Sequence, residues 1–180
     1  MLSLGRKEGE TAMKKGLLAA LLSLGFAFSA FSSAQKFGVF MDYAGYGYEV
    51  GMGSFGIGGY MALNPQLRVG GAIEFATVSL ASATGLGVRA DYLLGRVNLF
   101  DQPFSLDLYY GAQAGANLYF FSDALLTQLN LNGLLGFEYV FPKANLGFFS
   151  ELVLGPSFAF ASGESAFGLM YGGRFGLNFY

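Results

Sequence analysis

The stretch NPQLRVGGAIEFATVS, residues 64–79, alternates between two kinds of side chain. It opens with a turn-forming triplet, Asn64, Pro65 and Gln66. The positions on one face are then apolar or glycine: Leu67, Val69, Gly71, Ile73 and Phe75. Those on the other face combine small residues with full charges: Arg68, Gly70, Ala72, Glu74 and Ala76. Because successive side chains of a β-strand point to opposite faces of a sheet, this alternation predicts a strand with one apolar face and one small, charged face.

The same alternation recurs along the chain between regularly spaced breaks. Turn-forming residues cluster at 64–66, 98–103 and 142–145, where three of the four prolines stand, and four further breaks fall at 44–53, 79–83, 122–124 and 162–164. These breaks leave eight expected strands, near residues 36–43, 54–63, 67–78, 84–97, 104–120, 125–141, 146–160 and 166–180. An even number of strands with short alternating connections predicts an all-β fold, an eight-stranded antiparallel up-and-down β-barrel over residues 35–180.

The charges separate cleanly from the apolar residues. Ten of them fall within the expected strands on the face opposite the apolar one: Lys36, Asp42, Arg68, Glu74, Arg89, Asp91, Asp107, Glu138, Glu151 and Arg174. Arg96 is the exception, since its position has the parity of the apolar face, next to a turn. An Arg or Lys facing lipid at the midplane costs about 2–4 kcal/mol, so a membrane barrel would show this separation. A soluble sheet would show it too, and parity alone therefore leaves the choice open.

Two features favour an apolar face that points outward, toward lipid. Eight strands enclose a lumen just wide enough for side chains, and about four dozen apolar positions with many rings are too many to fill it. The aromatic residues also cluster at strand ends, as in the girdles of outer-membrane barrels. The expected clusters are Phe100, Phe104, Tyr139, Phe141, Phe179 and Tyr180 at one end, and Tyr43, Tyr46, Tyr48, Tyr119, Phe120, Phe121, Phe158, Phe160 and Phe167 at the other.

The first 34 residues have the features of an upstream extension and a secretory signal peptide. Lys14 and Lys15 precede an apolar segment at 16–31, and small residues end it at 32–34. The remaining chain holds six Lys or Arg and ten Asp or Glu, a net charge of −4, and carries no basic tract, so nucleic-acid binding lacks an electrostatic basis. The chain has neither cysteine nor histidine, which excludes disulfides and thiolate or imidazole metal sites.

At this point residues 35–180 resemble the small outer-membrane β-barrels of bacteria, the group of the OmpA transmembrane domain and OmpX. The resemblance rests on architecture and on the C-terminal alternation of Phe175, Leu177 and Phe179; the terminal aromatic residue, Tyr180, lies one place out of phase. It implies a monomer located in the cell outer membrane, with outer-membrane lipid and the barrel-assembly machinery as partners. The enzymatic members of such barrels use a histidine, which this chain lacks.

The inward charges are the candidate site, a network of Asp42, Arg68, Glu74, Arg89, Asp91, Asp107, Glu138, Glu151 and Arg174. Ionisable groups enclosed in a narrow barrel must be paired. Counting positions from the strand ends predicts that Arg174 bridges Asp42 and Glu151, that Glu74, Arg89 and Asp91 form a second cluster, and that Arg68, Asp107 and Glu138 lie lower. Such a network either fills the lumen as a structural core or forms a charged gate on a narrow water path.

The sequence therefore predicts a non-enzymatic integral outer-membrane barrel without cofactor or metal, with a largely filled lumen and a structural role or a very narrow pore. A carboxylate pair such as Asp107 and Glu138 is a weaker, catalytic interpretation. The alternative function is a soluble secreted ligand-binding barrel of lipocalin type, which requires an apolar lumen and a polar exterior.

Overall fold

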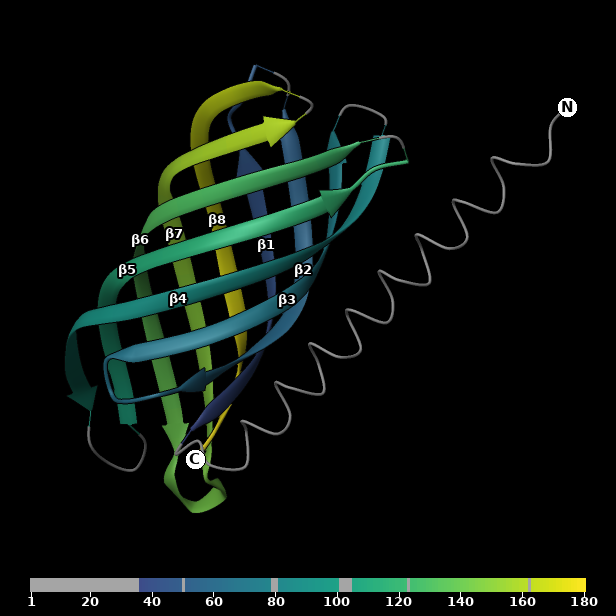
Figure 1. Ribbon diagram of the computed structural model, residues 1–180. Coiled ribbons are helices and arrows are strands. Elements are labelled where there is room, and N and C mark those ends of the chain that lie inside the picture. Colours follow the sequence, from purple (N-terminus) through teal and green to yellow (C-terminus); the bar gives the residue numbers. More distant parts are fainter. Residues whose placement is uncertain (1–35, 50, 79–80, 101–104, 123, 162) are drawn as a thin grey trace, which may run out of the picture. The chain divides into compact units, whose positions relative to one another are not determined.

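The computed structural model describes residues 36–49, 51–78, 81–100, 105–122, 124–161 and 163–180, except for the side chain of Pro142. Eight antiparallel strands pair in sequence order, and β8 closes on β1, so the expected eight-stranded barrel is confirmed (Figure 1). The strands are β1 Phe37–Tyr46, β2 Met52–Ala62, β3 Leu67–Val78, β4 Ala81–Phe100, β5 Ser105–Phe120, β6 Leu125–Phe141, β7 Leu146–Ala161 and β8 Glu164–Phe179. A short 3-10 helix, η1 (Pro142–Ala144), joins β6 to β7. Among the described residues, no helix is long and apolar enough to cross a membrane.

The connections define two ends of the barrel. Lys36, Tyr180 and the connections β2–β3, β4–β5 and β6–β7 lie at what we name the turn end, and the other four connections lie at the loop end. The β2–β3 turn follows from its sequence, because the side chain of Asn64 accepts hydrogen bonds from the backbone N–H groups of Gln66 and Leu67 at 2.9 and 2.8 Å. At the other described turn, Asn145 ends η1 in the left-handed region with φ 50°, which asparagine tolerates.

Several strands extend beyond the expected limits. The segment 44–53, which was expected to be a loop, instead contributes the last residues of β1 and the first of β2, and β4 runs from Ala81 to Phe100. Gly45 explains part of the difference. It pairs with Gly53 on one side and with Tyr171 on the other, and a β-carbon at Gly45 would lie 2.5 Å from the Tyr171 ring. This glycine therefore makes room for a neighbouring ring within a strand and does not mark a loop.

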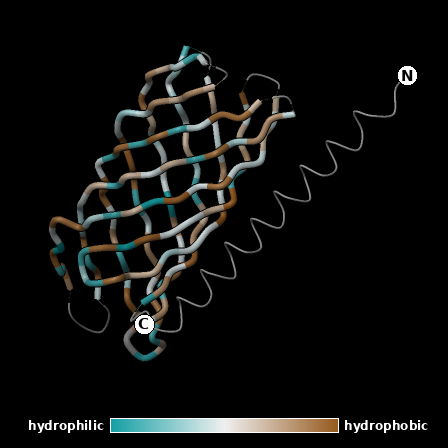
Figure 2. The backbone as a smooth tube through the Cα atoms, viewed as in Figure 1, coloured by the Kyte–Doolittle hydropathy of each residue, from teal (hydrophilic) through white to brown (hydrophobic). Residues whose placement is uncertain are grey.

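The faces of the wall carry opposite chemistry, as the alternation predicts. Outward leucines and valines are largely exposed, for example Leu131 (59%) and Val88 (62%), whereas the buried set includes Glu74, Asp91, Glu138, Glu151, Arg68 and Arg174. Figure 2 shows hydrophilic and hydrophobic residues alternating along the strands. The interior also holds buried aromatic residues, among them Phe40, Tyr60 and Phe149.

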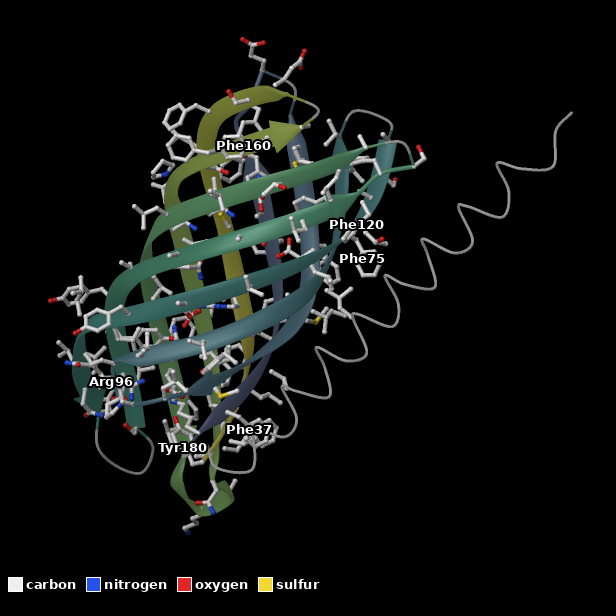
Figure 3. The ribbon with its side chains drawn as sticks, viewed as in Figure 1. Phe37, Phe75, Arg96, Phe120, Phe160 and Tyr180 are labelled. Atoms are coloured by element: carbon white, nitrogen blue, oxygen red, sulfur yellow. The ribbon has the colours of Figure 1, made fainter. Side chains whose placement is uncertain are left out.

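The aromatic clusters are only partly as expected. Figure 3 shows Phe37 and Tyr180 near the turn end, and Phe75, Phe120 and Phe160 toward the loop end. However, Tyr46 and Tyr119 are fully buried inside the barrel, and Tyr48 packs against that same interior cluster. Their assignment to an outward girdle was wrong, because β1 continues to Tyr46 with unbroken parity and Tyr119 has the inward parity of β5.

Candidate functional site: an ion network inside the barrel

Four charged side chains form a closed ring at the centre of the interior. Arg68 Nη2 lies 3.1 Å from Asp91 Oδ2 and 2.7 Å from Glu151 Oε1. Arg174 Nη2 lies 2.8 Å from the same Asp91 oxygen, and its Nε donates to Glu151 Oε2 at 2.5 Å. We name this group, Arg68, Asp91, Glu151 and Arg174, the central quartet. Its two positive and two negative charges balance, as buried ions require.

The central quartet spans the barrel from wall to wall. Arg68 and Asp91 come from β3 and β4, whereas Glu151 and Arg174 come from β7 and β8, which lie opposite in the strand order. Figure 1 shows β4 and β5 crossing in front of β8 and β1. A contact between opposite walls must pass through the interior, so the central quartet occupies the middle of the lumen.

Neighbouring side chains bind and cover the central quartet, although Arg68 Nε and Arg174 Nη1 are buried without a hydrogen-bond partner among the described residues. Tyr109 Oη donates to Glu151 Oε1 at 2.6 Å, and Gln113 Nε2 donates to Asp91 Oδ1 at 2.9 Å. The Arg68 guanidinium lies 4.8 Å from the Tyr60 ring centre and 5.5 Å from that of Tyr109. Aromatic rings thus face the cation and fill the space around it, as cation–π contacts do.

A second cluster lies on the loop-end side, where Arg89 contacts two carboxylates. Its Nη2 is 2.5 Å from Asp42 Oδ2 and 3.8 Å from Glu74 Oε1, and Tyr119 Oη donates to Glu74 Oε2 at 2.6 Å. A cavity of about 30 Å³ adjoins these side chains and reaches Arg174. A void of that size holds one or two water molecules.

A third cluster closes the turn end around Glu138. Lys36 Nζ and Arg96 Nη2 lie 2.7 and 2.6 Å from its carboxylate, which also accepts hydrogen bonds from Asn178 and Tyr180. Burial lowers the pKa of Lys36, and the negative charge of Glu138 opposes this shift. Burial and the hydrogen bond to Glu138 both raise the pKa of Tyr180. Tyr180, one place out of phase in the alternation, therefore binds inward through its hydroxyl while Phe179 stacks on Phe37 at 4.7 Å.

Arg96 joins this cluster because of a β-bulge. The register between β4 and β5 shifts between Leu93 and Gly95, and beyond it the inward parity of β4 changes from odd to even positions. Arg96 Nη1 consequently lies 3.2 Å from Asp107 Oδ2, and the Arg96 side chain is 41% exposed. Figure 3 places Arg96 at the turn end. The outward parity expected for Arg96 was wrong for this reason.

The structure brings all nine predicted residues into ion pairs, but not always with the expected partners. Arg174 bridges two carboxylates, yet these belong to Asp91 and Glu151, and Asp42 binds Arg89 instead. Arg68 reaches the central quartet and does not join Asp107 and Glu138. Counting positions from the strand ends ignores the tilt and stagger of a barrel, which displace residues of equal count along its axis.

The predicted network, which contained only charged residues, left out a set of buried amides and hydroxyls that continue it toward the loop end. Asn117 Nδ2 donates to Gln128 Oε1 at 3.1 Å, Gln128 Nε2 donates to Tyr48 Oη at 2.8 Å, and Tyr48 Oη lies 2.5 Å from Ser157 Oγ. The other buried amides are Gln113, Asn130 and Asn132, together with Asn178, which binds Glu138 at the turn end. Each has the same parity as the charges on its strand, and that shared parity was the available signal.

No group of three or more Asp, Glu, His or Cys residues in the described part of the chain is arranged to hold a metal ion. The network consists of ion pairs and hydrogen bonds. Every predicted carboxylate has a cationic side chain within 4 Å.

No protein-family model and no curated protein matches the chain. Among solved structures it is similar to Neisserial surface protein A, at 14% identity over 77% of this chain and 94% of that one, with a TM-score of 0.39. It is also similar to the N-terminal β-barrel domain of Pseudomonas aeruginosa OprF (17% identity, 79% and 97% covered, TM-score 0.37) and to a major outer membrane protein from Thermus thermophilus (15%, 79% and 98%, 0.37). The likeness concerns the fold alone, and the barrel itself rests on the strand pairing of this chain.

Proposed function

We propose that the chain is a non-enzymatic integral protein of an outer membrane, and that its charged interior is a structural core, not an open pore. The observation that supports the membrane location best is the inverted distribution of side chains. Leu131, Leu154 and Val88 point outward and are about three-fifths exposed, whereas Arg174 and Glu151 are 2% and 1% exposed. A soluble monomer rarely exposes apolar patches above a few hundred Å², and lipid removes that penalty.

The soluble lipocalin-type barrel fits this distribution poorly. Such a protein holds its ligand in an apolar lumen, but the lumen here carries the central quartet and buried amides such as Gln128 and Asn132. An enzymatic role is supported equally poorly, because the carboxylates considered for catalysis are engaged in ion pairs. Asp107 and Glu138, the one pair considered for acid–base work, both bind Arg96 at the turn end.

A closed interior is supported by the volume that remains. The central quartet crosses the lumen from wall to wall, and the cavity on its loop-end side has about 30 Å³. This space suits one or two waters and no hydrated ion with its shell. Buried ion pairs also resist separation, because removing one partner costs about 3–5 kcal/mol.

Conductance measurements in planar bilayers test the closed interior. We expect the purified, refolded barrel to be silent, and the Arg174→Ala variant, which opens the central quartet, to show conductance. Arg96→Ala, at the exposed turn end, is the matched control and is expected to remain silent. Steady conductance of the unchanged barrel would overturn the closed interior while leaving the membrane location intact.

Detergent dependence tests the location. We expect the barrel to require detergent or lipid and to be a monomer in both; a folded, monodisperse protein in plain buffer would overturn the proposal.

We further propose that residues 1–34 are removed as a secretory signal on export, with delivery to the barrel-assembly machinery afterwards. N-terminal sequencing of the protein from outer-membrane fractions should then begin at Gln35.

A further inference from the structure

Two of the three charged clusters inside the barrel are electrically balanced. The central quartet has two cations and two anions. The turn-end cluster also has two of each: Lys36, Arg96, Asp107 and Glu138. The third cluster, on the loop-end side, is not balanced, because Arg89 faces two carboxylates, Asp42 and Glu74. We name these three residues the loop-end cluster; with all three ionised, it carries a surplus of one negative charge.

The strand register brings the two carboxylates of the loop-end cluster together. Gly56 on β2 pairs with Asp42 on one side and with Glu74 on the other. A β-carbon at Gly56 would overlap the Asp42 carboxylate and would lie 3.3 Å from Glu74 Cγ. The two acidic side chains therefore fill the space above this glycine, and β2 contributes no charged side chain between them.

Arg89 is placed to neutralise one of these carboxylates and not both. Its Nη2 lies 2.5 Å from Asp42 Oδ2 but 3.8 Å from Glu74 Oε1, which is beyond hydrogen-bond distance. Glu74 is 4% exposed, and its other oxygen accepts a hydrogen bond from the Tyr119 hydroxyl, which brings no positive charge. A buried carboxylate without a cation of its own is costly in the ionised form, and taking up a proton removes that cost.

The cavity beside the loop-end cluster is lined by a buried donor that lacks a partner. Arg174 lines this cavity and is 2% exposed. Its Nε and Nη2 bind Glu151 and Asp91, whereas its Nη1 has no hydrogen-bond partner among the described residues. The cavity, of about 30 Å³, has room for a water molecule that accepts a hydrogen bond from this Nη1 and donates one to Asp42 or Glu74.

A metal cation suits this cavity less well than a proton. Arg89 and Arg174 both line the cavity, so a metal ion there would face two guanidinium groups. The described residues also contain no group of three or more acidic side chains arranged to hold one. The other titratable groups are tyrosine hydroxyls, which bring no positive charge: Tyr43 and Tyr46 line the cavity, and Tyr119 binds Glu74.

We propose that the loop-end cluster is a proton-binding site, in which Asp42, Glu74 and the cavity water share one proton in the folded barrel at neutral pH. The unfolded chain does not hold this proton, because a carboxyl group in water ionises at about pH 4. Folding therefore takes up one proton, and lowering the pH stabilises the barrel. With this proton bound, the loop-end cluster is neutral like the other two clusters.

Urea unfolding in phosphatidylcholine vesicles, between about pH 5 and pH 7, counts the proton. Because the folded state holds one proton more than the unfolded chain, the unfolding equilibrium constant should fall about tenfold for each pH unit of acidification. Glu74→Gln and Asp42→Asn each leave one carboxylate for Arg89, so both variants should lose this dependence. Asp107→Asn removes a carboxylate from the balanced turn-end cluster; it is the matched control and should keep the dependence.

Infrared spectroscopy of the folded barrel at neutral pH, in a detergent without ester groups, reads the proton independently of stability. A protonated carboxyl group has a C=O stretching band that a carboxylate lacks. We expect this band in the unchanged barrel and its loss in both Glu74→Gln and Asp42→Asn. Absence of the band from the unchanged barrel, its survival in both variants, or an unfolding constant that does not change with pH overturns the site. An unfolding constant that follows the Na⁺ or K⁺ concentration at fixed ionic strength, and not the pH, assigns the site to a metal ion and overturns the proton.

Discussion

Replacing Arg174 by methionine removes one corner of the central quartet while keeping a long, linear side chain. Asp91 and Glu151 would then share Arg68 alone, at 3.1 and 2.7 Å. Breaking a buried ion pair costs about 3–5 kcal/mol, and here each carboxylate keeps a second partner, Gln113 or Tyr109. We therefore expect a loss near the lower limit, about 3 kcal/mol of unfolding free energy.

A double variant separates the charge effect from lost packing. Arg174→Met combined with Glu151→Gln leaves Arg68 facing Asp91, so the centre regains neutrality. We expect the double variant to lose less stability than the sum of the two single variants, with a coupling of about 1–3 kcal/mol. Urea unfolding of the barrel in lipid vesicles, followed by circular dichroism, measures all three. A single variant that loses under about 1 kcal/mol, or losses that simply add, would falsify the idea that the central quartet acts as one charge-balanced unit.

Three further predictions concern other parts of the wall. Arg96→Gln should lower the unfolding free energy by no more than about 1 kcal/mol in the same urea assay, because its side chain is 41% exposed; a loss above about 3 kcal/mol would contradict this. Leu131→Arg should cost about 2–4 kcal/mol in vesicles, since it sets a charge on the outward face, and an unchanged midpoint would argue against lipid contact there. Gly45→Ala should cost about 1–3 kcal/mol by clashing with the Tyr171 ring, and Tyr171→Ala in the same chain should recover part of the loss; thermal unfolding with no such recovery would mean that the clash is not the cause.

The wall of the barrel was predictable from the sequence because strand alternation is a local property. The pattern of residues 67–78 assigns Ile73 and Phe75 to one face and Arg68 and Glu74 to the other, and the structure agrees. Closure of the sheet followed from the even number of strands and the need to cover their edges.

The partners inside the barrel were not predictable in the same way, because they depend on how far strands are displaced along the axis. The backbones of Asp42 and Arg174 are register partners across β1 and β8. Their side chains nevertheless bind elsewhere: Asp42 binds Arg89, and Arg174 binds Asp91 within the central quartet. The β4 bulge is a second example. In the sequence, only the adjacent Leu93 and Leu94 before a glycine interrupt the alternation, and this hint does not say on which side Arg96 will lie.

The position of Arg174 on the last strand has a consequence for how the molecule is completed. A chain synthesised only as far as β7 contains Arg68, Asp91 and Glu151, two carboxylates for one guanidinium, and has an open edge on β7. β8 brings the missing guanidinium and closes the hydrogen-bonded ladder to β1 in the same event. Wall and interior are therefore finished together, so a C-terminally truncated barrel should fail outright and not persist as a slightly weaker version of the whole.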